Sequence, residues 1–201
     1  INLLEVFKTS DSEKTNFTTH LSKLKTLYAF LSPNASDDER KEFENYVQRL
    51  YAECGLWDER KTNQRITGLD PRQYPVFSDL LNLIRRDLYT SYTPDASQQQ
   101  INSELSAGKL HRLEQIELTL KNLIDVYGTM FNGCTTVQNI TKERIVVFNV
   151  QNVVNMNDEI FSSMLFNILS LMLNDMINIG LPSKQMFERG EPWRDIPKLL
   201  L

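Results

Sequence analysis

The sequence predicts a mainly α-helical protein with a few short strands, in which about four amphipathic helices are inserted between pieces of a sheet. Two observations carry this prediction. Apolar residues recur at three- and four-residue intervals over four separate stretches in the first two thirds of the chain, which is the spacing of one helix face. Short apolar runs without that spacing stand outside these stretches, at residues 1–7, 144–150 and 199–201, and favour strands.

The totals limit the size and class of the protein. A chain of 201 residues and 23.4 kDa fits one domain, or one domain with a subdomain. Its formal net charge of −4 argues against non-specific wrapping of nucleic acid, which usually needs a basic excess. Cys54 and Cys134 are far apart and no Cys/His cluster exists, so neither a zinc site nor a disulfide scaffold is expected, and a reducing compartment fits.

The first elements follow from apolar spacing and capping residues. Residues 1–7 predict a strand, and residues 16–31 predict a helix with a single apolar face. Ser36 and Glu39 have the spacing of a capping box, so a second helix begins there. Gly55 is expected to end that helix.

A polar segment at residues 56–72 contains the basic cluster Arg60, Lys61 and Arg65. We favour a solvated connector over a contact for acidic protein or phosphate, but both interpretations stay open. A third helix follows Tyr74-Pro75, since proline is tolerated in a first turn. Arg85 and Arg86 fall toward its C-terminal end, where positive charge is favoured, so their default role is structural.

Residues 89–100 have the composition of a linker, and a fourth helix is expected between Gly108 and Gly128. The next stretch, residues 128–136, has two glycines five positions apart, as a phosphate-binding loop does. However, Gly133 is followed by Cys134 rather than lysine, and a helix rather than a strand precedes the stretch. We therefore predict a turn that returns the chain from the helical part to a sheet.

The last third of the chain is organised around a strand and a long apolar helix. Residues 144–150 are rich in the β-branched residues Ile and Val and predict a strand buried on both faces. Residues 158–179 predict a helix that is apolar nearly all round, ends at Gly180 and must be covered on most sides. Serine, asparagine and aspartate interrupt this helix, which favours a core helix over a membrane span.

No catalytic, cofactor-binding or metal-binding constellation is visible in the chain. The sequence has no GxSxG, no GxGxxG and no metal-ligand spacing. His20 and His111 stand alone on predicted helices, without a nucleophile nearby in sequence. No residue is therefore assigned to catalysis, a cofactor or a metal.

The order of segments resembles one family, the VirB/TraE-type ATPases of conjugative type IV secretion systems, within the FtsK/HerA-like group of P-loop motors. The stretches that carry the resemblance are residues 1–7 (INLLEVF), 17–25 (FTTHLSKLK), 38–51 (DERKEFENYVQRLY), 127–136 (YGTMFNGCTT), 144–150 (RIVVFNV) and 196–201 (IPKLLL). The first resembles the strand after the phosphate-loop helix of that family, and the next two resemble the start of a helical insertion. The following two resemble the return into the motor sheet, and the last resembles the strand that leads into the Walker B motif.

The resemblance implies a domain division and a site. Residues 1–8 would be a strand of a RecA-like α/β motor core, residues 9–127 an all-helical insertion, and residues 128–201 the return to that core, with strand 144–150 and the buried helix 158–179. The residues of the return segment that look like the family are Gly128, Phe131, Asn132, Gly133, Thr135 and Thr136. Both nucleotide motifs are absent from the 201 residues, which would then lie between Walker A and Walker B.

The resemblance also implies a function for the longer protein rather than for this piece. That protein would use ATP and Mg²⁺ to energise transfer of DNA or protein in a bacterial mobile genetic element, while this piece alone would not hydrolyse ATP. The helical part would contact other subunits of a secretion complex, as a possible homo-oligomer, in the cytoplasm and at the membrane only through partners. Without the motor core, helix 158–179 would be partly exposed or covered by a second copy.

Two other functions stay open at this stage. A free-standing helical adaptor that binds a protein partner through an apolar groove is the first alternative. A helical domain that contacts DNA through Arg60, Lys61, Arg65, Arg85 and Arg86 is the second, and the acidic total makes it the weaker of the two.

Overall fold

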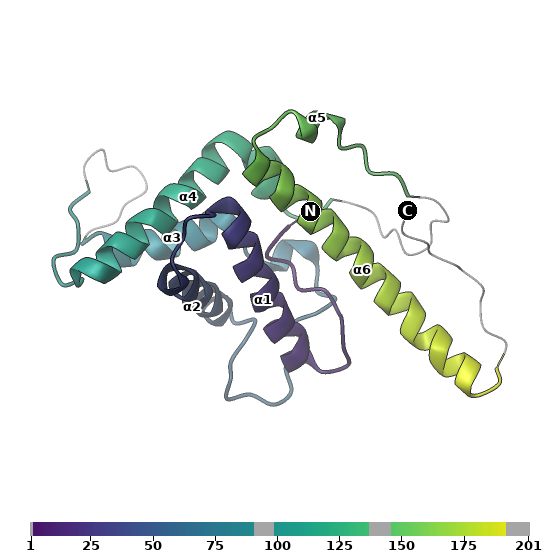
Figure 1. The fold of residues 1–201 in the computed structure, drawn as a ribbon. Coiled ribbons are helices and arrows are strands. Elements are labelled where there is room, and N and C mark those ends of the chain that lie inside the picture. The colour runs from purple at the N-terminus through teal and green to yellow at the C-terminus, as the bar shows by residue number, and fades with distance from the viewer. Residues whose placement is uncertain (1, 91–98, 137–145, 192–201) are drawn as a thin grey trace.

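The computed structural model describes residues 2–90, 99–136 and 146–191, and these residues are helical wherever they form regular structure (Figure 1). Five long helices make up this part of the chain: α1 (Glu13–Leu31), α2 (Asp37–Glu53), α3 (Phe77–Leu88), α4 (Ala107–Phe131) and α6 (Asp158–Glu188). A short 3₁₀ helix, η1 (Pro71–Gln73), precedes α3, and a single turn, α5 (Gln151–Val154), precedes α6. The α-helical part of the predicted fold is confirmed.

Helices α1 to α4 form a bundle, and α6 lies alongside α1 (Figure 1). Within the bundle, α2 packs against α1, α3 and α4, and α3 packs along α4. The centre is aromatic, because the rings of Tyr28 on α1 and Phe43 on α2 stack with centroids 4.4 Å apart. The C-terminal part of α6 extends away from this bundle (Figure 1).

Side chains that were recognisable in the sequence fix the helix starts. Ser36 accepts a 3.1 Å hydrogen bond from the Glu39 backbone N–H, so the Ser36 half of the predicted capping box is confirmed. The Glu39 carboxylate accepts a 2.6 Å hydrogen bond from the Tyr28 hydroxyl, which ties α2 to α1. Gly55 adopts a left-handed φ of +70° just after α2, as an ending glycine does.

The predicted strand at residues 1–7 is wrong for the described residues 2–7, which form a buried irregular segment. Leu3 and Leu4 are fully buried and Val6 is 1% exposed. Side chains satisfy this backbone instead of a neighbouring strand: the Leu4 N–H donates to Asn2 Oδ1 at 3.0 Å, and the Leu4 carbonyl accepts from the Tyr51 hydroxyl. The apolar side chains of this segment are buried, but they pack on helices rather than on the edge of a sheet.

The predicted strand at residues 144–150 is also wrong where the structure describes it, at residues 146–150. These residues form no regular structure, and the Val147 side chain is 83% exposed. A strand needs a paired neighbour for its backbone groups, and the described residues supply none here. The predicted strand at 199–201 lies outside the described residues.

Helix α6 differs from the prediction in length and in what it buries. It continues past Gly180, which costs a helix about 1 kcal/mol, and through Pro182, which costs about 3 kcal/mol, to Glu188. It is not enclosed: the side chains of Leu165, Leu169 and Leu173 are 39%, 43% and 59% exposed. The partial exposure that we expected for a piece of a longer protein is therefore present.

Candidate functional site

The basic side chains of residues 56–72 bond to groups nearby in the sequence. Arg60 and Lys61 both pair with Asp58, at 3.3 and 4.0 Å. The Arg65 guanidinium donates to the backbone carbonyls of Thr67 at 3.1 Å and Gly68 at 3.4 Å. These groups shape the connector before η1, and their role in binding a partner stays a prediction.

Arg85 and Arg86 link helices. Arg85 forms a partly buried ion pair with Glu117, at 2.6 Å, that joins α3 to α4. Arg86 pairs with Glu53 at the end of α2. These pairs support the structural role expected for both residues, and they leave less free positive charge on α3 for a nucleic-acid backbone.

The return segment, residues 128–136, begins inside α4 rather than after it. The predicted end at Gly128 is partly right: Tyr127 has a non-helical φ of −120° and ψ of 17°, so α4 is kinked there. A further helical turn then continues to Phe131, a residue only 1% exposed. Asn132 caps the end through its backbone N–H, which donates to the Gly128 carbonyl at 2.8 Å, and its Oδ1 accepts from the Ser78 N–H at 2.9 Å. Gly133 and Thr136 are exposed.

The start of the chain and the return segment meet at Thr135. The Thr135 hydroxyl accepts a 2.8 Å hydrogen bond from the Asn2 backbone N–H and donates to the Glu5 carboxylate. The Asn2 amide donates to the Pro75 carbonyl at 2.9 Å. Residues 2–5 and 132–135 are therefore in contact where the chain enters and leaves the four-helix bundle.

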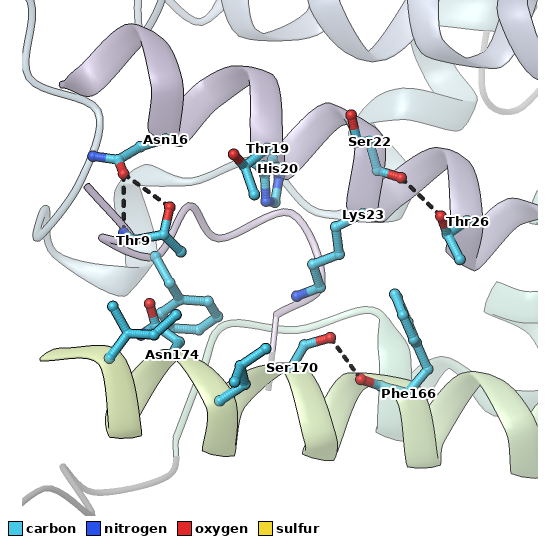
Figure 2. Close-up of a pocket in the computed structure, with 13 residues that line it drawn as sticks. Thr9, Asn16, Thr19, His20, Ser22, Lys23, Thr26, Phe166, Ser170 and Asn174 are labelled. Atoms are coloured by element: carbon cyan, nitrogen blue, oxygen red, sulfur yellow. Dashed lines mark hydrogen bonds between the residues drawn. The ribbon is translucent and has the colours of Figure 1, made fainter. Parts of the chain in front are cut away.

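A cavity of about 360 Å³ lies between α1, α6 and the N-terminal segment, and we call it the α1–α6 cavity (Figure 2). Polar side chains of α1 and α6 face each other across it, with Lys23 pointing toward α6 in Figure 2. Aromatic and aliphatic groups complete its wall. Its lining includes Phe7, His20, Lys23, Phe166, Ser170, Leu173 and Asn174.

Two cavity groups have unusual electrostatics. Burial lowers the pKa of Lys23 to about 8, while the Glu5 carboxylate acts in the opposite direction. Burial, together with the charge of Lys23, holds the pKa of His20 well below its ordinary value. A neutral His20 fits its 2.9 Å hydrogen bond between Nε2 and the Tyr51 hydroxyl.

Some polar residues of α6 are buried together with Ile160 and Ile168, whereas Asp158 and Asn178 are exposed. Ser163, Asn167, Asn174 and Asp175 are each at most 9% exposed, while Leu165, Leu169 and Leu173 form an exposed stripe that we call the α6 ridge. By length and hydropathy, α6 is the one helix in the described ranges that could cross a bilayer. A helix of a soluble protein that rests on a partner passes the same test.

Sequence reasoning did not find the α1–α6 cavity. The signal existed in part, since His20 and Lys23 share a face of α1, as Asn167, Ser170 and Asn174 share a face of α6. Periodicity defines these two faces but does not indicate that they lie opposite each other. Among the described residues, no group of three His, Cys, Asp or Glu side chains gathers closely enough to hold a metal ion.

Comparisons with known proteins find a relative by sequence and a solved structure with a similar fold. No family model matches the chain. An uncharacterized protein of Bacillus anthracis, pXO2-09, is 30% identical over 200 residues, which cover 94% of this chain but 29% of that protein. The solved structure of VirB4 of Thermoanaerobacter pseudethanolicus is similar with a TM-score of 0.67 and 20% identity, over 88% of this chain and 57% of that one. The chain thus has the fold of part of VirB4 and spans under two thirds of either protein.

Proposed function

We propose that this chain is the helical part of a longer VirB4-like ATPase that energises conjugative transfer through a type IV secretion system. The observation that carries the proposal is the fold likeness to VirB4 over 88% of the chain. The resemblance of the sequence segments to this family, in the same order, is a separate support. The chain also spans only part of both proteins it matches.

The contact between the two ends of the bundle supports an inserted position. Thr135 bonds to Asn2 and Glu5, so a parent chain could leave its core at residue 2 and return at residue 135 without distortion of that core. Domains whose ends lie close together are the ones that tolerate such an arrangement. On this proposal, the Walker A and Walker B motifs flank the chain in the longer polypeptide.

The α6 ridge is the surface through which this part would contact the rest of the machine. An apolar stripe on a helix whose polar side is already covered favours a protein neighbour. We propose that the neighbour is the motor core or another subunit of the secretion complex, in the cytoplasm and at the membrane through partners. ATP and Mg²⁺ would bind to the longer protein, because the 201 residues contain no phosphate-loop motif.

The test compares the chain with the longer polypeptide that contains it. We expect the longer protein to hydrolyse ATP and the 201-residue chain to bind no ATP at micromolar concentration. Leu169→Lys should abolish most ATPase activity of the longer protein while leaving the thermal stability of the chain unchanged. Leu118→Lys is the matched control, since Leu118 is 60% exposed on α4 and outside the ridge.

Three results would contradict the proposal. They are micromolar ATP binding by the 201-residue chain, a longer protein without ATPase activity, and equal effects of the Leu169 and Leu118 substitutions. The exposed α6 ridge also suits a helical adaptor that has no motor core. If the longer protein lacks ATPase activity but Leu169→Lys still releases a bound protein partner, the adaptor is the correct function.

A further inference from the structure

The α1–α6 cavity holds polar atoms whose hydrogen-bonding capacity is unfilled. The Lys23 ammonium has three N–H donors. In the described part of the chain it donates a long hydrogen bond of 3.4 Å to Asn167 Oδ1. A buried ammonium group without a full set of acceptors is destabilised, so a ligand that supplies acceptors to Lys23 would be stabilised.

The remaining wall is apolar. Phe7 lies beneath the Lys23 ammonium, which is 5.5 Å from the ring centroid, and Phe166 and Leu173 line the α6 side. A volume of about 360 Å³ is near the lower end of the roughly 300–1,000 Å³ typical of small-molecule sites. The cavity therefore suits a small ligand with one charged end and an apolar body.

We propose that the α1–α6 cavity binds a small apolar monocarboxylate, with its charged end at Lys23 and its apolar body against the aromatic and aliphatic wall. The carboxylate would accept hydrogen bonds from the Lys23 ammonium on α1. The apolar body would contact Phe7, Phe166 and Leu173.

The charges around the cavity limit a ligand to one negative charge. Glu5, on the N-terminal segment, is the acidic group that acts on Lys23, and its carboxylate accepts a hydrogen bond from Thr135. His20 on α1 is held neutral, and the α6 residues that line the cavity are uncharged. One lysine in an apolar wall can balance one negative charge, whereas a dianionic phosphate would be buried with an unbalanced charge.

The experiment uses the 201-residue chain and two probes that differ only in charge. Calorimetric titration with N-acetyl-leucinate should give saturable binding, and N-acetyl-leucinamide should bind at least about tenfold more weakly, because a hydrogen bond to a charged group is lost. Binding of the carboxylate should also raise the pKa of Lys23. Titrations near pH 8.5 in buffers of different ionisation enthalpy should therefore show proton uptake.

Two variants and one control locate the binding. Lys23→Met keeps the apolar stem and removes the charge, and it should weaken carboxylate binding at least about tenfold. Lys14→Met, on an exposed position of the same helix, should bind as the unmodified chain does. Ser170→Leu should fill the cavity and abolish binding, which keeps the test valid if Lys23→Met fails to fold.

The proposal is wrong under any of three outcomes. These are no saturable carboxylate binding at millimolar concentration, equal binding of the amide, and undiminished binding by Ser170→Leu. None of them bears on the ATPase proposal, whose test substitutes Leu169, a residue of the α6 ridge that does not line the cavity.

Discussion

A single hydroxyl links the first two helices in the core. Tyr28 is fully buried, and its hydroxyl donates a 2.6 Å hydrogen bond to the Glu39 carboxylate, which is 8% exposed. Tyr28→Phe should therefore destabilise the chain by about 1–3 kcal/mol, because a buried carboxylate loses its donor. Denaturant unfolding at pH 7 measures this loss. Tyr127→Phe, on a partly exposed tyrosine of α4, should have a small effect, and equal losses would contradict the assignment.

The half-buried lysine of the cavity makes stability depend on pH. Burial lowers the pKa of Lys23 to about 8 from the ordinary 10.5, so between these values the unfolded chain binds more protons than the folded one. Stability should accordingly rise with pH from about 8 toward 10. Lys23→Met should remove this rise and be at least as stable as the unmodified chain at pH 7. Urea unfolding at pH 7, 8, 9 and 10 measures both effects, and an unchanged slope in the variant would show that Lys23 is not the group involved.

At the scale of an element, the cap of α2 is the feature that the sequence specifies most directly. Ser36→Ala removes the acceptor for the Glu39 N–H and should cost about 1 kcal/mol. Thermal unfolding followed by circular dichroism should show a melting temperature lower by a few degrees. Ser22→Ala is the control, because Ser22 is exposed inside α1, where alanine is the better helix former. A loss at Ser22 as large as that at Ser36 would exclude a capping effect.

The elements that the sequence predicted correctly are those that depend on local chemistry. Ser36, the apolar spacing of the first four helices and the turn at Gly55 act within a few residues, so a single sequence contains their signal. The strand predictions failed at the described residues 2–7 and 146–150, because a strand needs a partner from elsewhere in the chain. Instead, Tyr51 and Asn2 satisfy the backbone of the first segment. Helix α6 shows the same limit, since a helix that is apolar nearly all round in the sequence does not indicate which of its sides another element covers.

At the scale of the whole molecule, the contact at Thr135 holds the two ends of the bundle together. Its hydroxyl is bonded to Asn2 and Glu5, so Thr135→Val should break both links while nearly preserving side-chain shape. We expect a loss of about 1–3 kcal/mol, since two polar groups lose their partner. Amide exchange at residues 2–7 should also accelerate more than exchange in α2 and α3, because the segment would open without unfolding of the bundle.

The neighbouring Thr136 provides the matched control for this prediction. It is exposed, so Thr136→Val should leave both stability and exchange nearly unchanged. Uniform acceleration across all helices in Thr135→Val would mean that the contact supports the entire fold rather than the junction of its ends. A selective effect at residues 2–7 would show that the bundle folds as a unit whose two ends are joined separately. That behaviour is what an insertion within a larger motor requires, because its two connections must stay together while the inserted helices remain intact.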